Sequence, residues 1–162
     1  MTEIDRLKLL SELGIDSGEH IWEIEISRSK VTALAINDSL RLVRINKDVP
    51  VPITQDDANT IAPYYESAIG NLTSVLARYC EPALGGGVDY TNDKVVYRLV
   101  VGDNHDDNRL IPLRSVCNRY LADCILEGFY ATQGGSEQSL NAIRSHLHAR
   151  KRSAARKVRP IL

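Results

Sequence analysis

The stretch "KVVYRLVVGDNHDDNRLIPLRSVCNRYLADCILEGFYA", residues 94–131, indicates more about the fold than any other, because it predicts a strand, a turn and a long helix in succession. Residues 94–101 are rich in β-branched side chains, which favour a strand. Residues 102–108 are polar and predict a turn, in which Asp107 or Asn108 caps the following helix. From residue 110 onward, apolar residues recur every three or four positions, as on one face of a helix. The predicted apolar face consists of Leu113, Val116, Cys117, Tyr120, Leu121, Cys124, Ile125 and Phe129.

A second long helix is predicted upstream of this strand, over residues 58–79, from the same three- and four-residue spacing of apolar side chains. Thr54 and Asp57 have the spacing of an N-terminal capping pair. Pro63 falls inside the helical pattern and predicts either a kink or a helix that begins later. Between this helix and the strand, residues 81–93 predict a loop that is flexible around its three consecutive glycines.

The N-terminal part of the chain predicts a short helix over residues 2–13 and then three strands. The clearest strand is "HIWEIEI", residues 20–26, in which apolar and acidic side chains alternate with the two-residue period of a half-buried strand. "KVTALAI", residues 30–36, is a weaker second strand. "LRLVRI", residues 40–45, is the third, with arginines interrupting its alternation. Residues 46–52 contain two prolines and break regular structure.

A last helix is predicted to begin at Ser136, with Leu140, Ile143 and Leu147 on its inward face. No apolar periodicity continues after Leu147. We therefore predict one α+β domain over residues 1–147, in which a small, mainly antiparallel sheet packs against two or three long helices. Residues 148–162 follow as a flexible basic C-terminal arm.

The bulk composition is that of an ordinary globular chain of 162 residues, 43% hydrophobic and 25% charged. No run approaches the ~20 apolar residues of a membrane-spanning helix, and the N-terminus mixes charges into its apolar residues, unlike a signal peptide. We therefore expect an intracellular protein without a membrane partner. The three cysteines, Cys80, Cys117 and Cys124, include no CxxC pair and predict reduced, buried thiols.

No motif in the sequence predicts catalysis or a cofactor. The acidic turn "GDNHDDN", residues 102–108, lacks the glycine and glutamate spacing of a calcium loop, so we interpret it as a turn rather than a metal site. The "GGG" at residues 85–87 is not followed by the Gly-Lys-Ser/Thr of a phosphate-binding loop. We therefore expect no enzyme, no metal and no cofactor. Carboxylates that only the fold brings together are the alternative that remains open.

The C-terminal segment is the most unusual feature of the sequence, because its charge is opposite to that of the rest. Residues 144–162 carry seven basic and no acidic side chains, whereas residues 1–143 carry 13 basic and 21 acidic side chains, a net charge of −8. The candidate contact residues are Arg144, Arg150, Lys151, Arg152, Arg156, Lys157, Val158, Arg159, Ile161 and Leu162.

Three interpretations of this arm remain open. It is a solubilising tail, a polycation that contacts phosphates without sequence specificity, or an arm that docks on the acidic surface of an identical neighbouring subunit. The arm contains no aromatic residue that could stack on bases, which disfavours specific single-strand binding. The apolar Val158, Ile161 and Leu162 favour docking on a protein, because a purely electrostatic contact does not use them.

Four segments in this order resemble the small neck proteins of tailed bacteriophages and prophages. They are "NTIAPYYESAIGNLTSVLARY" (59–79), "DKVVYRLVV" (93–101), "LIPLRSVCNRYLADCILEGFYA" (110–131) and "IRSHLHARKRSAARKVRP" (143–160). The resemblance is to head–tail connector, adaptor and tail-completion proteins, and it covers residues 55–160. The strand-rich residues 20–45 differ from the all-helical connectors, so a tail-terminator-like role is also open.

The resemblance implies a non-enzymatic structural protein of the virion, assembled in the host cytoplasm. In that family, small subunits form rings below the portal, arms dock on neighbouring subunits, and DNA passes through the lumen. The implied partners are copies of the chain in a ring and other neck, portal or tail proteins, with possible non-specific contact to packaged DNA. The alternative is a nucleic-acid-binding accessory protein that uses the basic arm.

Overall fold

The computed structural model of the protein describes residues 20–45, 51–102 and 107–132, together with the single residues 5, 141, 145, 148, 149 and 152. The strands in this part of the chain are β1 (His20–Ser27), β2 (Gly87–Tyr90) and β3 (Lys94–Val101). The long helices are α2 (Arg28–Ile45), α3 (Ala58–Leu76) and α4 (Leu110–Ala131). Short 3-10 turns lie at Gln55–Asp57, Ala77–Tyr79, Pro82–Leu84 and Asp107–Arg109.

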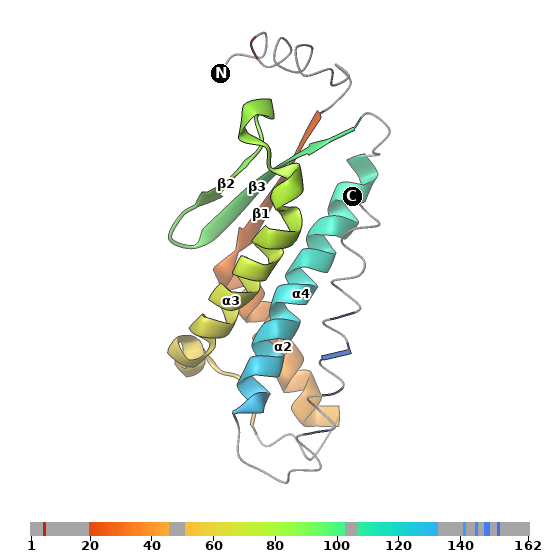
Figure 1. The fold of residues 1–162 in the computed structure, drawn as a ribbon. Coiled ribbons are helices and arrows are strands. Elements are labelled where there is room, and N and C mark those ends of the chain that lie inside the picture. Colours follow the sequence, from red (N-terminus) through yellow and green to blue (C-terminus); the bar gives the residue numbers. More distant parts are fainter. Residues whose placement is uncertain are drawn as a thin grey trace.

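The three strands form an antiparallel sheet in the order β1-β3-β2. The register places Trp22 opposite Leu99 and Ile24 opposite Tyr97, so their side chains share one buried face. Helices α3 and α4 lie side by side across this face (Figure 1). The predicted α+β class, with a small antiparallel sheet packed against long helices, is confirmed.

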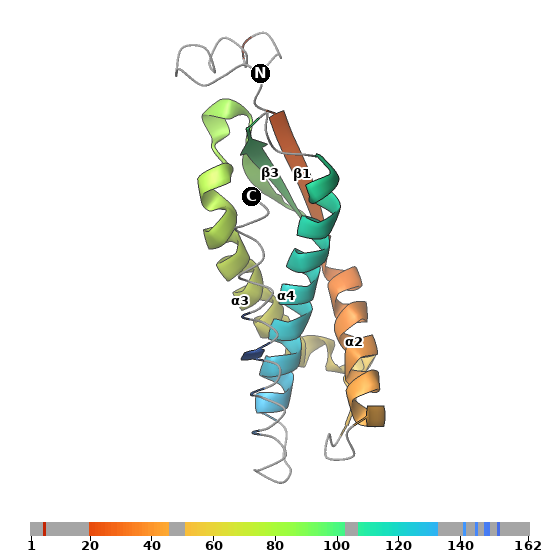
Figure 2. The same ribbon diagram turned by 90° about the vertical axis from the view of Figure 1, so that its right-hand side faces the viewer.

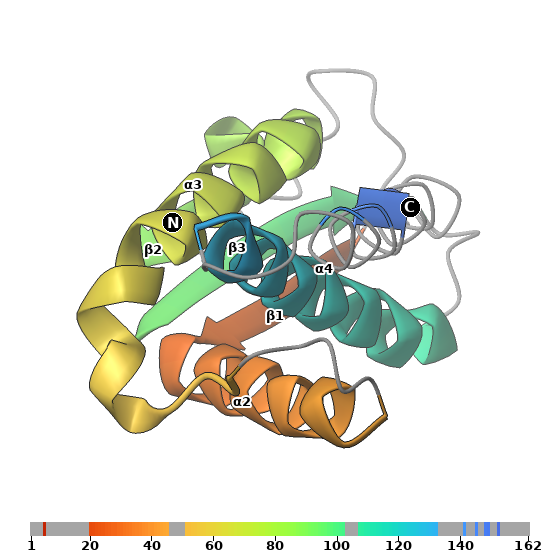
Figure 3. The ribbon, with the colours of Figure 1, turned by 90° about the horizontal axis from the view of Figure 1, so that it is seen from below.

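Helix α4 is the centre of the helical layer. Viewed from below, it lies between α3 and α2, and it contacts both of them as well as β1 (Figure 3). Its predicted inward residues Leu113, Cys117 and Leu121 are fully buried. Farther along, Ala122, Asp123, Leu126 and Tyr130 are also buried although they point in other directions, so the second half of α4 is enclosed on most sides.

The predicted strands over residues 30–36 and 40–45 are wrong, because residues 28–45 form the single helix α2. Its buried side chains Val31, Ala35 and Ser39 are spaced by four residues, which is helical spacing. The apparent alternation of "LRLVRI" is too short to distinguish a strand from a helix. Figure 2 shows α2 extending from the end of β1 away from the sheet, where it packs against α4.

The predicted loop over residues 81–93 is also partly wrong, because β2 lies within it and forms a hairpin with β3. The glycines that predicted flexibility have a steric role instead. Gly85 has φ of 87° and ends a 3-10 turn in the left-handed conformation. At Gly86, a Cβ would lie 2.8 Å from the backbone nitrogen of Glu81.

The starts of α3 and α4 differ in how well the sequence predicted them. The backbone N–H of Thr54 donates to Oδ2 of Asp57 over 2.8 Å, which confirms this capping pair. Helix α3 begins at Ala58 and contains Pro63, so the alternative of a later start is wrong. The predicted cap of α4 is wrong: Arg109 is its N-cap residue, no side chain caps it there, and Asp107 instead accepts a hydrogen bond from the Trp22 indole.

The two terminal helices fall mostly outside the described residues. Within the predicted helix over residues 2–13, Asp5 is described and is helical. Within the last helix, the predicted inward residues Leu140, Ile143 and Leu147 are outside the described part, as is the acidic turn from Asp103 to Asp106.

Candidate functional site

The C-terminal segment is helical at its described positions, including those beyond Leu147. Asn141, Ser145, His148, Ala149 and Arg152 are each helical and exposed. Arg152 is the described member of the predicted contact residues. The others lie outside the described residues: Arg144, Arg150, Lys151, Arg156, Lys157, Val158, Arg159, Ile161 and Leu162.

A contact at His148 joins this segment to α4. Nδ1 of His148 lies 3.2 Å from Oε1 of Glu127. Glu127 lies at the rim of a hollow of about 230 Å³ between α3 and α4, which Tyr64 and Ser67 line from α3. The helices approach each other closely there, since a Cβ at Gly128 would lie 2.4 Å from the Tyr64 ring. The first residue of the predicted arm, His148, therefore lies against α4.

A charged cluster ties α2 to α4 inside the protein. Arg119 of α4 forms an ion pair with Asp38 of α2, and its Nη1 also lies 3.9 Å from Oδ1 of Asp123. The side chains of Asp38 and Asp123 are 8% and 0% exposed. Buried carboxylates are tolerated only with charged or hydrogen-bonding partners, so Arg119 fixes the position of α2 on α4. This cluster is not among the sites predicted from the sequence, although the four-residue spacing of Arg119 and Asp123 indicates a helical ion pair.

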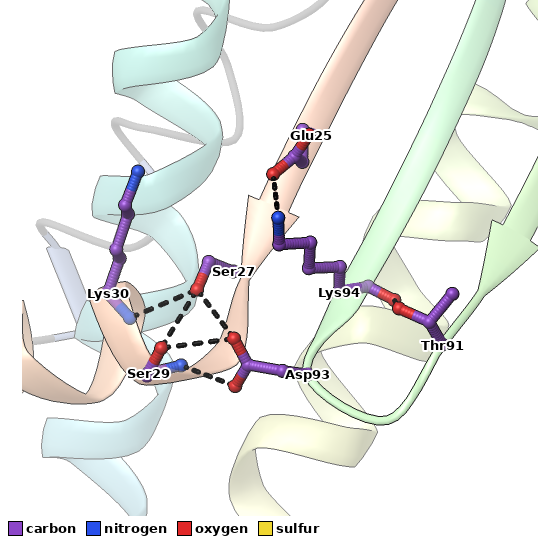
Figure 4. A network of polar contacts seen from close by, with 7 residues as sticks. All are labelled: Glu25, Ser27, Ser29, Lys30, Thr91, Asp93 and Lys94. Carbon is purple, nitrogen blue, oxygen red and sulfur yellow. Dashed lines mark hydrogen bonds and ion pairs between the residues drawn. The ribbon is translucent and has the colours of Figure 1, made fainter.

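A second polar network fixes the start of α2 (Figure 4). Oδ2 of Asp93 accepts hydrogen bonds from the hydroxyls of Ser27 and Ser29, at 3.0 and 3.1 Å, and Oδ1 accepts one from the Ser29 backbone. These donors hold the pKa of Asp93 below its ordinary value. The side chain therefore caps α2 from the β2–β3 turn, a role that the local sequence of α2 does not reveal.

An ion pair continues this network onto the open face of the sheet. Nζ of Lys94 lies 2.9 Å from Oε1 of Glu25 on the neighbouring strand. The hydrogen bond and the attraction of Lys94 lower the pKa of Glu25, and Glu25 in turn raises the pKa of Lys94. Both side chains are exposed, so the pair orders the surface and adds little stability.

Burial holds two of the described thiols and several of the described phenols in their neutral forms. The three cysteines are free thiols; Cys80 and Cys117 are buried and Cys124 is half-buried. Burial raises the pKa of Cys117 to about 12 and also raises that of Cys80. Burial likewise raises the pKa of Tyr120 and of Tyr130 to about 12. These groups are protonated at neutral pH, which suits packing and disfavours nucleophilic chemistry.

Neither the described residues nor known proteins assign this chain to a functional class. Within the described ranges, no three histidine, cysteine or acidic side chains gather as a metal site. None of the helices there combines the length and the apolar character needed to cross a membrane. No family model, no curated protein sequence and no solved structure matches the chain.

Proposed function

We propose that the protein is a non-enzymatic structural subunit of the neck or tail-completion ring of a tailed bacteriophage. Its C-terminal arm docks on a neighbouring subunit or on a partner ring. The observation that supports the proposal is the contact between His148, the first residue of the predicted arm, and Glu127 of α4. It favours an arm that starts beside α4.

The length and chemistry of the remaining residues support docking. Residues 153–162 would reach about 33 Å if fully extended, enough to leave one small domain and contact the next. They combine Arg156, Lys157 and Arg159 with an apolar end at Ile161 and Leu162. Cations match the acidic surface of an identical chain, and buried apolar residues supply most of the binding energy of a protein contact.

The second candidate function is a nucleic-acid-binding accessory protein that uses the arm. The absence of any acid from residue 144 to the end of the chain favours it, because such a segment attracts phosphates. The apolar end of the arm is what favours docking over this alternative.

The test compares two full-length variants with the wild-type chain. One carries Ile161→Ser and Leu162→Ser, and the other carries Arg156→Glu, Lys157→Glu and Arg159→Glu. Light scattering and electron microscopy measure assembly, and a ring has a mass many times 18.0 kDa. We expect the serine variant to lose rings. Rings that persist in the serine variant while the charge variant loses them would contradict apolar docking, and a wild-type chain that forms no ring at any concentration would contradict self-assembly.

A further inference from the structure

We infer that the solvent-exposed face of α2 is a second binding surface, one that contacts the phosphates of duplex nucleic acid. This face is separate from the C-terminal arm, and the inference does not depend on ring formation. It exists only because residues 28–45 form a helix. The exposed residues of α2 gather on one side of it: Ser29, Lys30, Ala33, Asn37, Leu40, Arg41 and Arg44.

The charged side chains that α2 itself contributes to this face are all positive, and the carboxylate of Asp93, which bonds Ser29, lies at its start. The single acid in α2 is Asp38, which lies on the opposite, buried side and pairs with Arg119. In the part of the chain that the structure describes, Lys30, Arg41 and Arg44 take part in no ion pair with an acid. Arg41 and Arg44 are therefore available to a ligand, whereas Lys30 also attracts the carboxylate of Glu25. Because these three side chains are exposed, they can move to match the spacing of phosphates.

The length of the face fits a nucleic-acid backbone. From Lys30 to Arg44 the helix rises by about 21 Å. A duplex strand presents one phosphate every 3.4 Å along its axis, which gives about six over this length, and the straight face meets those on the side of the duplex turned toward it. Asn37 lies between the cations and adds a hydrogen-bond donor of the kind that contacts phosphate oxygens.

The positive surface continues from α2 onto α4. Lys30 and Arg114 line an open hollow of about 270 Å³ together with Asn118 and Ser27. Glu25 also lines the hollow, but its carboxylate is held 2.9 Å from Nζ of Lys94. The hollow therefore adds Arg114 to the cations of α2, and its acid, Glu25, is paired with Lys94 while also attracting Lys30 and Arg114.

The composition of the face favours nucleic acid over a protein partner. Leu40, which is 40% exposed, is its single large apolar side chain. Protein interfaces have a desolvated apolar centre from which charges are depleted, whereas nucleic-acid interfaces are polar and strongly positive. The small side chains Ser29 and Ala33 leave the helix surface open to close approach. Because no side chain on this face is placed to read base edges in particular, we expect affinity without sequence preference.

The test measures binding of the full-length chain to a 24-base-pair duplex DNA of mixed sequence, by fluorescence anisotropy between 50 and 200 mM KCl. The face variant carries Arg41→Gln and Arg44→Gln. The matched control carries Arg78→Gln and Arg109→Gln, which remove the same charge from exposed positions. These two lie at the end of α3 and the start of α4, near the sheet and away from the far end of α2 (Figure 1).

Each phosphate contact contributes about 0.9 to the slope of log affinity against log salt, so the face variant should lose about 1.8 from that slope. The control should keep the wild-type slope. If the double variant melts differently from the wild type, the single changes Arg41→Gln and Arg44→Gln are used instead, each with an expected loss of about 0.9.

Four results would overturn the inference. The first is a wild-type chain that fails to bind the duplex at 50 mM KCl, and the second is a face variant that binds the duplex like the wild type. The third is an equal loss of affinity in both variants, which indicates a general charge effect. The fourth is a face variant that loses rings while keeping its DNA affinity, which assigns the face to a protein contact. Normal rings combined with reduced DNA affinity in the face variant would support the inference whatever the role of the arm.

Discussion

Replacing Arg119 by methionine should destabilise the protein strongly, although Arg119 is at the surface edge of the helical layer. Its guanidinium contacts Asp38 from one side and Asp123 from the other. Methionine keeps the unbranched stem that packs between α2 and α4 but removes the charge. The two buried carboxylates then lose a cation that both of them approach.

The size of the effect follows from the burial of these three side chains. Breaking a buried ion pair by removing one partner costs about 3–5 kcal/mol. Arg119 is 37% exposed, so water compensates part of the loss and we expect about 3 kcal/mol. In a chain of this length, 1 kcal/mol corresponds to about 2–4 °C in melting temperature, so Tm should fall by roughly 6–12 °C.

The measurement is urea denaturation and thermal melting, each followed by circular dichroism. Arg114→Met is the matched control, because Arg114 is an exposed arginine on the same helix and should change stability by no more than about 0.5 kcal/mol. Adding Asp38→Leu to Arg119→Met should recover part of the loss, since it removes one of the two carboxylates that Arg119 approaches. An Arg119→Met protein as stable as the Arg114→Met control would refute the assignment of Arg119 as the tie between α2 and α4.

Three further predictions concern the core, the start of α2 and the thiols. Leu76 is fully buried in α3, so Leu76→Asp should leave the protein unfolded or aggregated, at a cost of several kcal/mol against a total of about 5–15; a soluble variant with unchanged Tm would contradict the burial. Asp93→Ala should lower Tm at pH 7. Because hydrogen bonds depress the folded-state pKa of Asp93, the stability that its carboxylate contributes is present above its ordinary pKa near 3.8. The difference in Tm between the variant and the wild type should vanish as pH falls through the lower folded-state pKa. A difference in Tm that does not depend on pH would indicate packing instead. A thiol reagent at pH 8 should label the half-buried Cys124 before Cys117, whose pKa is about 12, as read by mass spectrometry of digests; earlier labelling of Cys117 would contradict this order.

The candidate site was predicted from sequence in one respect and missed in two. The run of cations after residue 143 is visible without any structure, because charge needs no tertiary contact to be counted. Glu127, which contacts His148, could not be recognised, because 21 residues separate the two in the chain. In the sequence, Arg41 and Arg44 interrupt the alternation of a predicted strand. In the helix that residues 28–45 form, they lie on one face with Lys30.

The elements that sequence predicted correctly carry long, regular patterns. In β1 and β3 an apolar residue stands at every second position, and in α3 and α4 apolar residues recur over 19 and 22 residues, so burial of one face selects a single conformation. The capping pair of Thr54 and Asp57 could also be predicted from the sequence, because the three-residue spacing places both groups within one turn.

Helix α2 depends on partners far away in the chain, and strand β2 depends on pairing with β3. The carboxylate of Asp93 that caps α2 lies 64 residues after Ser29, and the arginine that pairs with Asp38 lies 81 residues after it. Strand β2 has four residues, too few for a pattern of its own, and its backbone groups are satisfied by pairing with β3. A residue pattern shows which face of a segment is apolar. It does not show which distant side chain bonds the end of a helix, or which strand supplies the hydrogen bonds of another. For α2 the distant partners, and for β2 the pairing with β3, set the conformation in place of local propensity.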